Sequence, residues 1–390
     1  FPTEGWEPVT RIHSDNHLWL VMTCYHIIME EGKLDYLDEV VPYYDDVPDS
    51  GSSVLETYTM LNSSGRTVWE HIKKSIDFAM DNLGSHGFPL MLSSDWNDML
   101  YKVCREGKGE SIWTSMQLGT VLPMMAELAE LKGESGQKYL DIYESQKKLI
   151  NEVAWDGEWF RRCITDEGRF IGSKEEPQAK IWLNTQSWSV LSGMGDKEKQ
   201  ILAMDSVKKY LDTELGIKKI HPAMQDYPSR EDPLTYYNKG CGENGSVFCH
   251  ANTWAIIAEC MLKRPENAYK YYHQLLPMVA QAKAGEWRYK AEPYVYASNI
   301  FGPESDKFGL ANVSWLTGTA AWMYIAVTQY MLGIRATWNG LEIDPCLAPE
   351  MLPAKVTRVF RGCRYEITIK KNKSFFIPHE EGRTEYWCEV

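Results

Sequence analysis

The chain has 390 residues, 44% of them hydrophobic, which is typical of a folded globular protein rather than a disordered or fibrous one. Its 41 lysines and arginines against 54 aspartates and glutamates give a formal net charge of -13, which argues against binding to nucleic acid. No run of about 18 apolar residues occurs, so the sequence predicts no membrane span and no membrane partner.

Helical periodicity dominates the first 335 residues, with almost none of the alternation typical of strands. The spacing predicts helices over 18–29, 68–83, 112–131, 139–153, 181–191, 197–211, 251–262, 268–282 and 314–332. Helical hairpins in series favour an (α/α) barrel, a helical toroid, over a simple bundle. We therefore assign residues 1–335 to a mainly α domain of this kind.

Long loops separate these helices, over 42–53, 92–109, 220–249 and 284–312. Long loops in a compact domain are usually functional or disordered. Because these loops carry Trp, Asp, Glu, His and Tyr, we expect them to be functional.

The pattern changes near residue 336. Residues 356–360 and 365–369 alternate apolar and polar side chains on either side of Gly362, which predicts a β-hairpin, and 384–390 is expected to add a strand. Residues 336–390 are too few for a complete sandwich. We expect a small, partial, jelly-roll-like β-sandwich region.

The 9 cysteines are scattered, without a CxxC pair, as is typical of reduced thiols in a cytoplasmic protein. The start, Phe1 to Gly5, shows neither the basic nor the apolar stretch of a signal peptide. It also lacks an initiator methionine, so we expect a processed or truncated piece of a longer protein.

The first candidate site is the segment SSDWND at 93–98. A carboxylic acid can protonate the leaving oxygen of a glycosidic bond, and a neighbouring Trp96 would supply an apolar wall that raises a carboxyl pKa and packs on a sugar. The two acids, Asp95 and Asp98, could equally be solvated groups at a helix cap.

The second candidate is the segment RIHSDNHLW at 11–19. Its polar side chains could bind sugar hydroxyls, but Asp15 or Asn16 could also simply cap the helix that starts at Leu18. For the segment alone, capping is the more common outcome.

Two further candidates contain glycines. Three glycines lie within six residues at 240–245, ahead of His250, and they let the backbone approach a ligand closely. Thr317 and Gly318 near a helix start form a reasonable anion cradle or an ordinary small-residue packing site.

Several other chemistries have no support in the sequence. No GxxxxGK[ST], GxGxxG or GxSxG motif occurs, which argues against nucleotide binding and serine-hydrolase chemistry. His250 with Cys241 or Cys249 matches no common zinc spacing, so we expect no metal site.

Taken together and in this order, eight segments resemble the inverting β-glucoside phosphorylases of the cellobiose phosphorylase family, glycoside hydrolase family 94. The segments are SDNHLWL at 14–20, DWND at 95–98, GES at 109–111, NTQSW at 184–188, GENG at 242–245, HANTW at 250–254, EPY at 292–294 and WLTG at 315–318. The resemblance covers nearly the whole chain. Asn16 departs from it, because the family usually has a second Asp there.

The resemblance implies an (α/α)6 barrel and reversible phosphorolysis of a cellobiose- or cellodextrin-type β-glucoside to α-glucose 1-phosphate. It implies inorganic phosphate as co-substrate, no cofactor and a homodimer, and the family's N-terminal β-sandwich is absent from this chain. It places the general acid at Asp98, substrate contacts at Arg11, Asp15, Asn16, Trp96, Gln186, Tyr237, Glu243 and Glu292, and phosphate contacts at His250, Thr317 and Gly318.

Two other functions remain open. An inverting glycoside hydrolase on the same barrel would use Glu243 or Glu292 as the base that activates water. A non-catalytic carbohydrate-binding protein would not need Asp98. The pairing of His250 with Thr317-Gly318 favours the phosphorylase, because hydrolysis needs no phosphate site.

Overall fold

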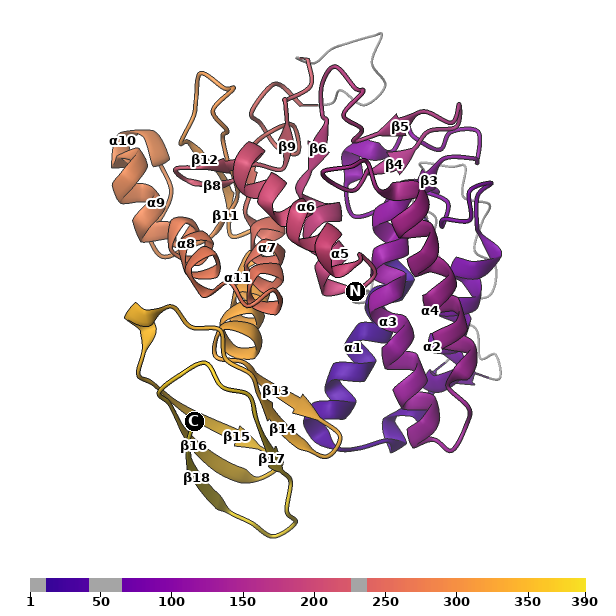
Figure 1. Ribbon diagram of the computed structural model, residues 1–390, viewed down its shortest axis with the longest axis vertical. Helices are drawn as coiled ribbons and strands as arrows, with labels where there is room; N and C mark the ends of the chain where they lie inside the picture. Colours follow the sequence, from indigo (N-terminus) through magenta and orange to yellow (C-terminus); the bar gives the residue numbers. More distant parts are fainter. Residues whose placement is uncertain (1–11, 42–64, 226–236) are drawn as a thin grey trace, which may run out of the picture.

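The helices of the protein form an inner and an outer layer (Figure 1), in a computed structural model that describes residues 12–41, 65–225 and 237–390. The inner helices are α1 (Asn16–Glu31), α3 (Ile112–Leu131), α5 (Leu183–Leu191), α7 (Cys249–Met261) and α11 (Thr319–Ile325). Each of them packs against the next one in this order.

The outer helices follow the inner ones in the chain and cover them. The outer helices are α2 (Val68–Asp81), α4 (Gln137–Leu149), α6 (Lys197–Tyr210) and α8 (Pro265–Leu275), which pack on α1, α3, α5 and α7 respectively. The inner helix α3 buries side chains on every face, whereas α2 buries one stripe that includes Trp69, Ile72 and Ile76. This difference in burial is that of an inner and an outer helix.

Most helices start and end close to the predicted positions, with four differences. The predicted helix 314–332 begins only at Thr319, and Ser314 is the last residue of a strand. The predicted helix 268–282 is two helices, α8 and α9 (Pro277–Ala284), because proline cannot continue a helix and pushes the preceding Leu276 to an extended ψ of 126°. Residues 150–154 and 326–331 form π-helical turns after α4 and α11. The short helix α10 (Glu286–Tyr289) lies in a segment that was predicted as loop.

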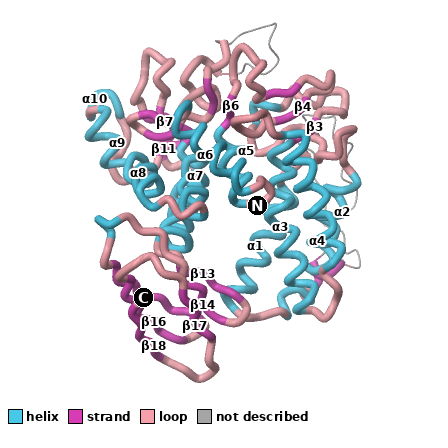
Figure 2. The backbone as a smooth tube through the Cα atoms, in the orientation of Figure 1, coloured by secondary structure: helices cyan, strands magenta, loops and turns pink. Residues whose placement is uncertain are grey.

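The sequence shows almost no strand alternation before residue 335, but the structure has strands in this region. Small antiparallel strands pair in the loops, most of them only two residues long and therefore too short to show alternation. Figure 2 shows most of them in magenta among the loops at one end of the helices. They are β1 (Val40–Val41), β2 (Arg66–Thr67), β3 (Glu110–Ser111), β4 (Cys163–Ile164), β5 (Phe170–Ile171), β6 (Ile181–Trp182), β7 (Asp212–Thr213), β8 (Gly216–Ile217), β9 (Ile220–His221), β10 (Val247–Phe248), β11 (Ala297–Ile300) and β12 (Ala311–Ser314).

The C-terminal strands form two three-stranded sheets at the other end of the helices (Figure 1). One sheet contains β13 (Ile334–Thr337), β14 (Gly340–Ile343) and β17 (Phe375–Pro378); the other contains β15 (Ala354–Phe360), β16 (Cys363–Ile369) and β18 (Glu385–Glu389). The predicted hairpin is confirmed: Arg361 and Gly362, with φ of 46° and 79°, form the two-residue turn between β15 and β16. The predicted last strand, β18, pairs in parallel with β16.

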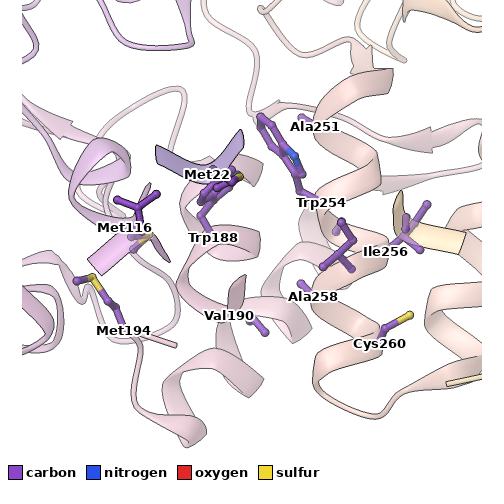
Figure 3. Close-up of a cluster of buried hydrophobic side chains, with 14 of the residues drawn as sticks. Met22, Met116, Trp188, Val190, Met194, Ala251, Trp254, Ile256, Ala258 and Cys260 are labelled. Carbon is purple, nitrogen blue, oxygen red and sulfur yellow. The ribbon is translucent and has the colours of Figure 1, made fainter. Parts of the chain in front are cut away.

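The centre of the inner layer is a cluster of tryptophans, one from each inner helix. We call Trp19, Trp113, Trp188, Trp254 and Trp322 the tryptophan cluster; its neighbouring ring centroids lie 5.2 to 6.5 Å apart. Figure 3 shows two of them, Trp188 and Trp254, among the buried side chains of α5 and α7. Edge-to-face and offset contacts of this kind add to the stabilisation that burial of the rings provides.

Arginines of the β15–β16 hairpin join the C-terminal strands to the end of α1. The Arg361 guanidinium donates to the main-chain oxygens of Met29 (2.6 Å) and Trp338 (2.8 Å). Arg358 donates to both carboxylate oxygens of Glu30, at 2.5 and 2.7 Å. A cation at the end of a helix satisfies carbonyls that lack partners within the helix and interacts favourably with the helix dipole.

We expect Arg361→Ala to lower the free energy of unfolding by about 2–3 kcal/mol, because hydrogen bonds from a charged group to main-chain carbonyls of α1 and of the β13–β14 turn are lost. Urea unfolding followed by circular dichroism measures the effect. Arg364→Ala is the matched control, since Arg364 lies on the same hairpin, is exposed, and pairs with Glu366 only two residues away. An equal loss in both variants would contradict the role of Arg361.

Candidate active site

A cavity of about 340 Å³ lies where α1, α7 and α11 begin, at the end of the inner layer away from the C-terminal sheets. It brings together eight of the predicted site residues: Asp15, Asn16, Trp96, Asp98, Glu243, His250, Thr317 and Gly318. Five residues that were not predicted complete the lining: His13, Trp19, Phe248, Ser298 and Leu316.

The loop that carries Asp98 is fixed by the buried carboxylate of Asp95. Asp95 accepts hydrogen bonds from the Asn97 main chain (2.9 Å), the Ser111 hydroxyl (2.6 Å) and Arg162 (2.6 Å). Arg162 also donates to the Asn97 side chain at 2.6 Å. Charge-assisted bonds with both partners buried hold the loop in one conformation.

The carboxyl of Asp98 faces an open part of the cavity. Asp98 is the first residue of a 3-10 turn (Asp98–Leu100), and its side chain is 81% exposed, in contrast to the fully buried Asp95. The ring Nδ1 of His13 lies 3.9 Å from Asp98 Oδ1. A carboxyl in this position is accessible to a substrate, whereas Asp95 is already occupied by its own loop.

Asp15 is a buried carboxyl with one oxygen available. Trp19 Nε1 donates to its Oδ2 at 2.8 Å, while Oδ1 has no partner among the described residues. Burial raises the pKa of Asp15 to about 6, and the hydrogen bond from Trp19 opposes this rise. An unpaired buried oxygen beside a cavity is suited to accept a hydrogen bond from a hydroxyl group of a ligand.

His250 lies edge-on against Trp96, with ring centroids 4.9 Å apart. Burial, together with the nearby charge of Lys219, lowers the pKa of His250 to about 3, so the imidazole is neutral near pH 7. Its Nε2 has no partner in the part of the chain that the structure describes. A neutral imidazole in this position can donate one N–H to a ligand.

Gly318 lies directly against the His250 ring. A Cβ at this position would lie 2.6 Å from His250 Cε1, closer than side chains approach one another. The hydroxyl of the preceding Thr317 is 2.6 Å from that of Thr319 and accepts a hydrogen bond from the Thr319 main chain. The site therefore needs a residue without a side chain at 318 because the imidazole occupies that space.

Gln186, predicted as a substrate contact, lies away from the cavity. Its side chain is fully buried; its oxygen accepts from the Phe160 main chain at 2.8 Å, and its nitrogen donates to the Phe160 and Trp182 carbonyls. These bonds use the amide to tie the start of α5 to the neighbouring segment. The structure thus corrects that prediction, because no part of the amide remains for a sugar.

Two other predicted residues, Glu292 and Tyr237, are not part of the cavity lining. Glu292 accepts a hydrogen bond from Trp315 Nε1 (3.1 Å) outside the cavity lining. Tyr237 packs against a second, smaller group of buried side chains, with its ring close to Gly242. Arg11 lies outside the described residues.

Two buried cations beneath the cavity were also missed by the sequence analysis. Arg162 and Lys219 are both fully buried, and they pair with Asp95 and Glu243. Lysines and arginines are usually exposed, so nothing in the local sequence marks these two. His13 and Trp19, by contrast, lie within the candidate segment at 11–19. Their place in that segment could have marked them as lining residues.

Within 12–41, 65–225 and 237–390, no group of three or more His, Cys, Asp or Glu side chains is placed to hold a metal ion. Among these same residues, no helix combines the length and the apolar character that crossing a bilayer requires.

The cavity offers an accessible carboxyl, neutral N–H and hydroxyl donors, and aromatic walls.

Comparisons with known proteins agree with the resemblance of the motifs. A solabiose phosphorylase from Paenibacillus borealis is 33% identical over 374 residues, which cover 95% of this chain and 46% of that protein. An N,N'-diacetylchitobiose phosphorylase from Vibrio proteolyticus is 33% identical over 361 residues, covering 92% and 42% respectively. The chain thus spans less than half the length of these relatives.

Among solved structures, a GH78 family rhamnosidase of Bacillus sp. GL1 matches with a TM-score of 0.48 and 16% identity, over 83% of this chain and 31% of that one. This likeness is too distant to support an argument. A sequence model of one protein family matches residues 4–333. That family is described as the glycosyl hydrolase 94 superfamily, catalytic domain. Because that match covers most of the chain, the protein belongs to the glycosyl hydrolase 94 superfamily.

Proposed function

We propose that this protein catalyses reversible, inverting phosphorolysis of a β-linked glucosyl disaccharide or oligosaccharide to α-glucose 1-phosphate. One observation supports this most: a single cavity is lined both by the accessible carboxyl of Asp98 and by the donors around His250. The relatives whose names denote phosphorylases of solabiose and diacetylchitobiose support the same reaction class.

In this mechanism Asp98 is the general acid. A phosphate oxygen attacks the anomeric carbon as the glycosidic bond breaks, and Asp98 gives its proton to the leaving oxygen. Attack from the face opposite the leaving group inverts the anomeric centre, so a β-glucoside yields the α-phosphate. Before the next forward turnover Asp98 takes up a proton from solvent, to which it is exposed. In the reverse reaction Asp98 accepts the proton of the acceptor hydroxyl as that hydroxyl attacks glucose 1-phosphate and phosphate leaves.

The nucleophile explains why no second catalytic carboxylate is needed. A hydrolase must activate water with a base, whereas a phosphate anion is already nucleophilic and has to be bound next to the anomeric carbon. The N–H of His250, the Thr317 hydroxyl and the unobstructed Gly318 provide such a site without a metal or cofactor. The two alternative bases fit poorly, since Glu243 is paired with Lys219 and Glu292 lies outside the cavity lining.

The remaining lining residues are assigned to the sugar. Asp15 and Asn16 bind hydroxyls of the glucosyl unit, Trp96 packs against it, and Glu243 binds the acceptor. Cellobiose and cellodextrins are the substrates we propose to test first. The relatives act on other disaccharides by name, so solabiose and diacetylchitobiose belong in the same panel.

We further propose that the inner and outer helices form part of an (α/α)6 barrel, to which a C-terminal β-region is joined near residue 336. The order in which the inner helices pack, each against the next, supports this architecture. A homodimer in the cytoplasm is the proposed working form.

The reaction is tested by product analysis with each disaccharide, with and without inorganic phosphate. We expect glucose 1-phosphate only when phosphate is present. Free glucose without phosphate would indicate a hydrolase, and binding without turnover in either direction would indicate a carbohydrate-binding protein. Asp98→Asn is expected to slow phosphorolysis by about 10²–10⁴-fold, because proton donation to the leaving group is lost.

The Asp98 variant has two controls. Asp77→Asn also removes one carboxylate, but on the exposed outer helix α2, and should leave the rate unchanged. An aryl β-glucoside whose leaving group needs no proton should lose much less rate than the disaccharide in Asp98→Asn. A wild-type rate on the disaccharide would remove Asp98 from the role of acid.

Gly318→Ala is expected to raise the KM for phosphate by about tenfold or more while changing the KM for the disaccharide less, because the new methyl group displaces the His250 ring. Initial rates over a grid of phosphate and disaccharide concentrations measure both constants. In a His250→Ala background the same methyl group has room, so Gly318→Ala should then add little. Equal effects on both KM values would contradict a phosphate site here.

Asp15→Asn is expected to stabilise the protein at pH 7 while weakening sugar binding. The pKa of Asp15 rises from 3.8 to about 6 on folding, so its ionisation destabilises the folded state progressively between these pH values and fully above them. The gain should be on the order of 2–3 kcal/mol at pH 7 and near zero at about pH 4. Urea unfolding at both pH values measures it, and an equal change at both would show that ionisation is not the cause.

A further inference from the structure

Lys219 is a fully buried lysine that lies behind the wall of the cavity and is not part of its lining. It directly precedes β9, and its main chain is fixed on both sides. Its N–H donates to Ser246 O at 2.8 Å, and its carbonyl accepts from Leu183 N at 2.9 Å. The start of the Lys219 side chain is therefore held by α5 on one side and by the segment before β10 on the other.

The ammonium group contacts three side chains that do line the cavity. Its Nζ lies 3.5 Å from Glu243 Oε1, 4.6 Å from the Trp96 ring centroid and 4.1 Å from the Phe248 ring centroid. A cation between two aromatic faces, away from water, is attracted to both. One buried charge thus supports three separate parts of the wall.

Among the described residues, Glu243 has no other cation close enough to form an ion pair. Arg162, the other buried cation nearby, pairs with Asp95 at 2.6 Å. The second oxygen of Glu243 accepts a neutral hydrogen bond from Asn97 at 3.2 Å. Burial raises the pKa of Glu243, and Lys219 acts against this rise, so without Lys219 a buried carboxylate would be left without compensation.

We propose that Lys219 is a positioning residue that keeps Glu243 ionised and holds it, together with Trp96, in place for the sugar. This inference rests on the proposed function, because Glu243 serves there as a hydrogen-bond acceptor for the acceptor sugar. A protonated Glu243 would present an O–H where the sugar hydroxyl needs an acceptor oxygen. Lys219 is not part of the cavity lining, so it acts on the sugar through these two neighbours and not by direct contact.

A double-mutant cycle tests the coupling between the two residues. Lys219→Met removes the charge with little change in length, and Glu243→Gln makes residue 243 permanently neutral. We expect each single variant to raise the KM for the sugar acceptor by about tenfold and the double variant to be no worse than either one. Additive losses would overturn the proposal, because they would mean that Lys219 does not act through Glu243.

Lys218→Met is the matched control. Lys218 is the adjacent residue in the chain, is also buried and also forms an ion pair, but its partner is Glu304 (2.8 Å) and it does not line the cavity. We expect it to lower stability and leave the acceptor KM unchanged. An equal rise in acceptor KM in both lysine variants would overturn the proposal by showing a general effect of losing a buried pair.

A spectroscopic measurement decides the ionisation state without any turnover. In the infrared difference spectrum of Lys219→Met against Lys219→Met/Glu243→Gln, we expect the carbonyl band of a protonated carboxylic acid near pH 7. The pair wild type against Glu243→Gln should show the bands of a carboxylate instead. Absence of the acid band overturns the inference, whereas an inactive wild type that gives the expected bands counts only against the proposed function.

Discussion

The structure depends on the contact among five tryptophans at the centre of the inner layer, because each inner helix contributes one of them. A helix in this layer is buried on several sides, so large and rigid aromatic side chains are needed to fill the space between it and its neighbours. The tryptophan cluster meets that need and sets the distances between the helices. Those distances in turn fix where α1, α7 and α11 begin, and the cavity lies at these three positions.

Above the tryptophan cluster the structure changes from apolar packing to paired charges. Asp95 with Arg162 and Glu243 with Lys219 bury two negative and two positive groups side by side, so the formal charge of the group is zero. Buried pairs of this kind contribute little net stability, since removing the charges from water costs about as much as their attraction gains. Their use here is geometric: the first pair holds the loop of Asp98, and in the second pair Lys219 lies behind the cavity wall to which Trp96 and Glu243 belong.

Much of the fold could be predicted from local patterns, and the differences have physical reasons. The long helices and the β15–β16 hairpin are confirmed because their periodicities of about 3.6 and 2 reflect which face is buried. The break at Pro277 was present in the sequence but was overlooked within an apolar stretch. The two-residue strands could not be predicted, since a pattern needs more than two positions and these strands pair only where the helices bring the loops together.

Part of the candidate site could be predicted, because the type of a residue limits the chemistry that its side chain can perform. The segments that resemble the family predicted Asp98, His250 and Gly318 as site residues, and the structure brings these three residues to one cavity. The resemblance failed for Gln186, because an amide can bind a backbone as readily as a sugar, and only the fold decides between them. Lys219 could not be found at all, since burial of a lysine depends on contacts distant in the chain.

The arrangement of the aromatic rings has an optical consequence. Trp96 lines the cavity and its ring lies 4.6 Å from that of Trp254, a member of the tryptophan cluster. At such separations an excited indole passes its energy to its neighbours, so the rings emit as a coupled group rather than one by one. Under the proposed function a sugar stacks on Trp96, and the emission of the whole group is then expected to change when the cavity is occupied.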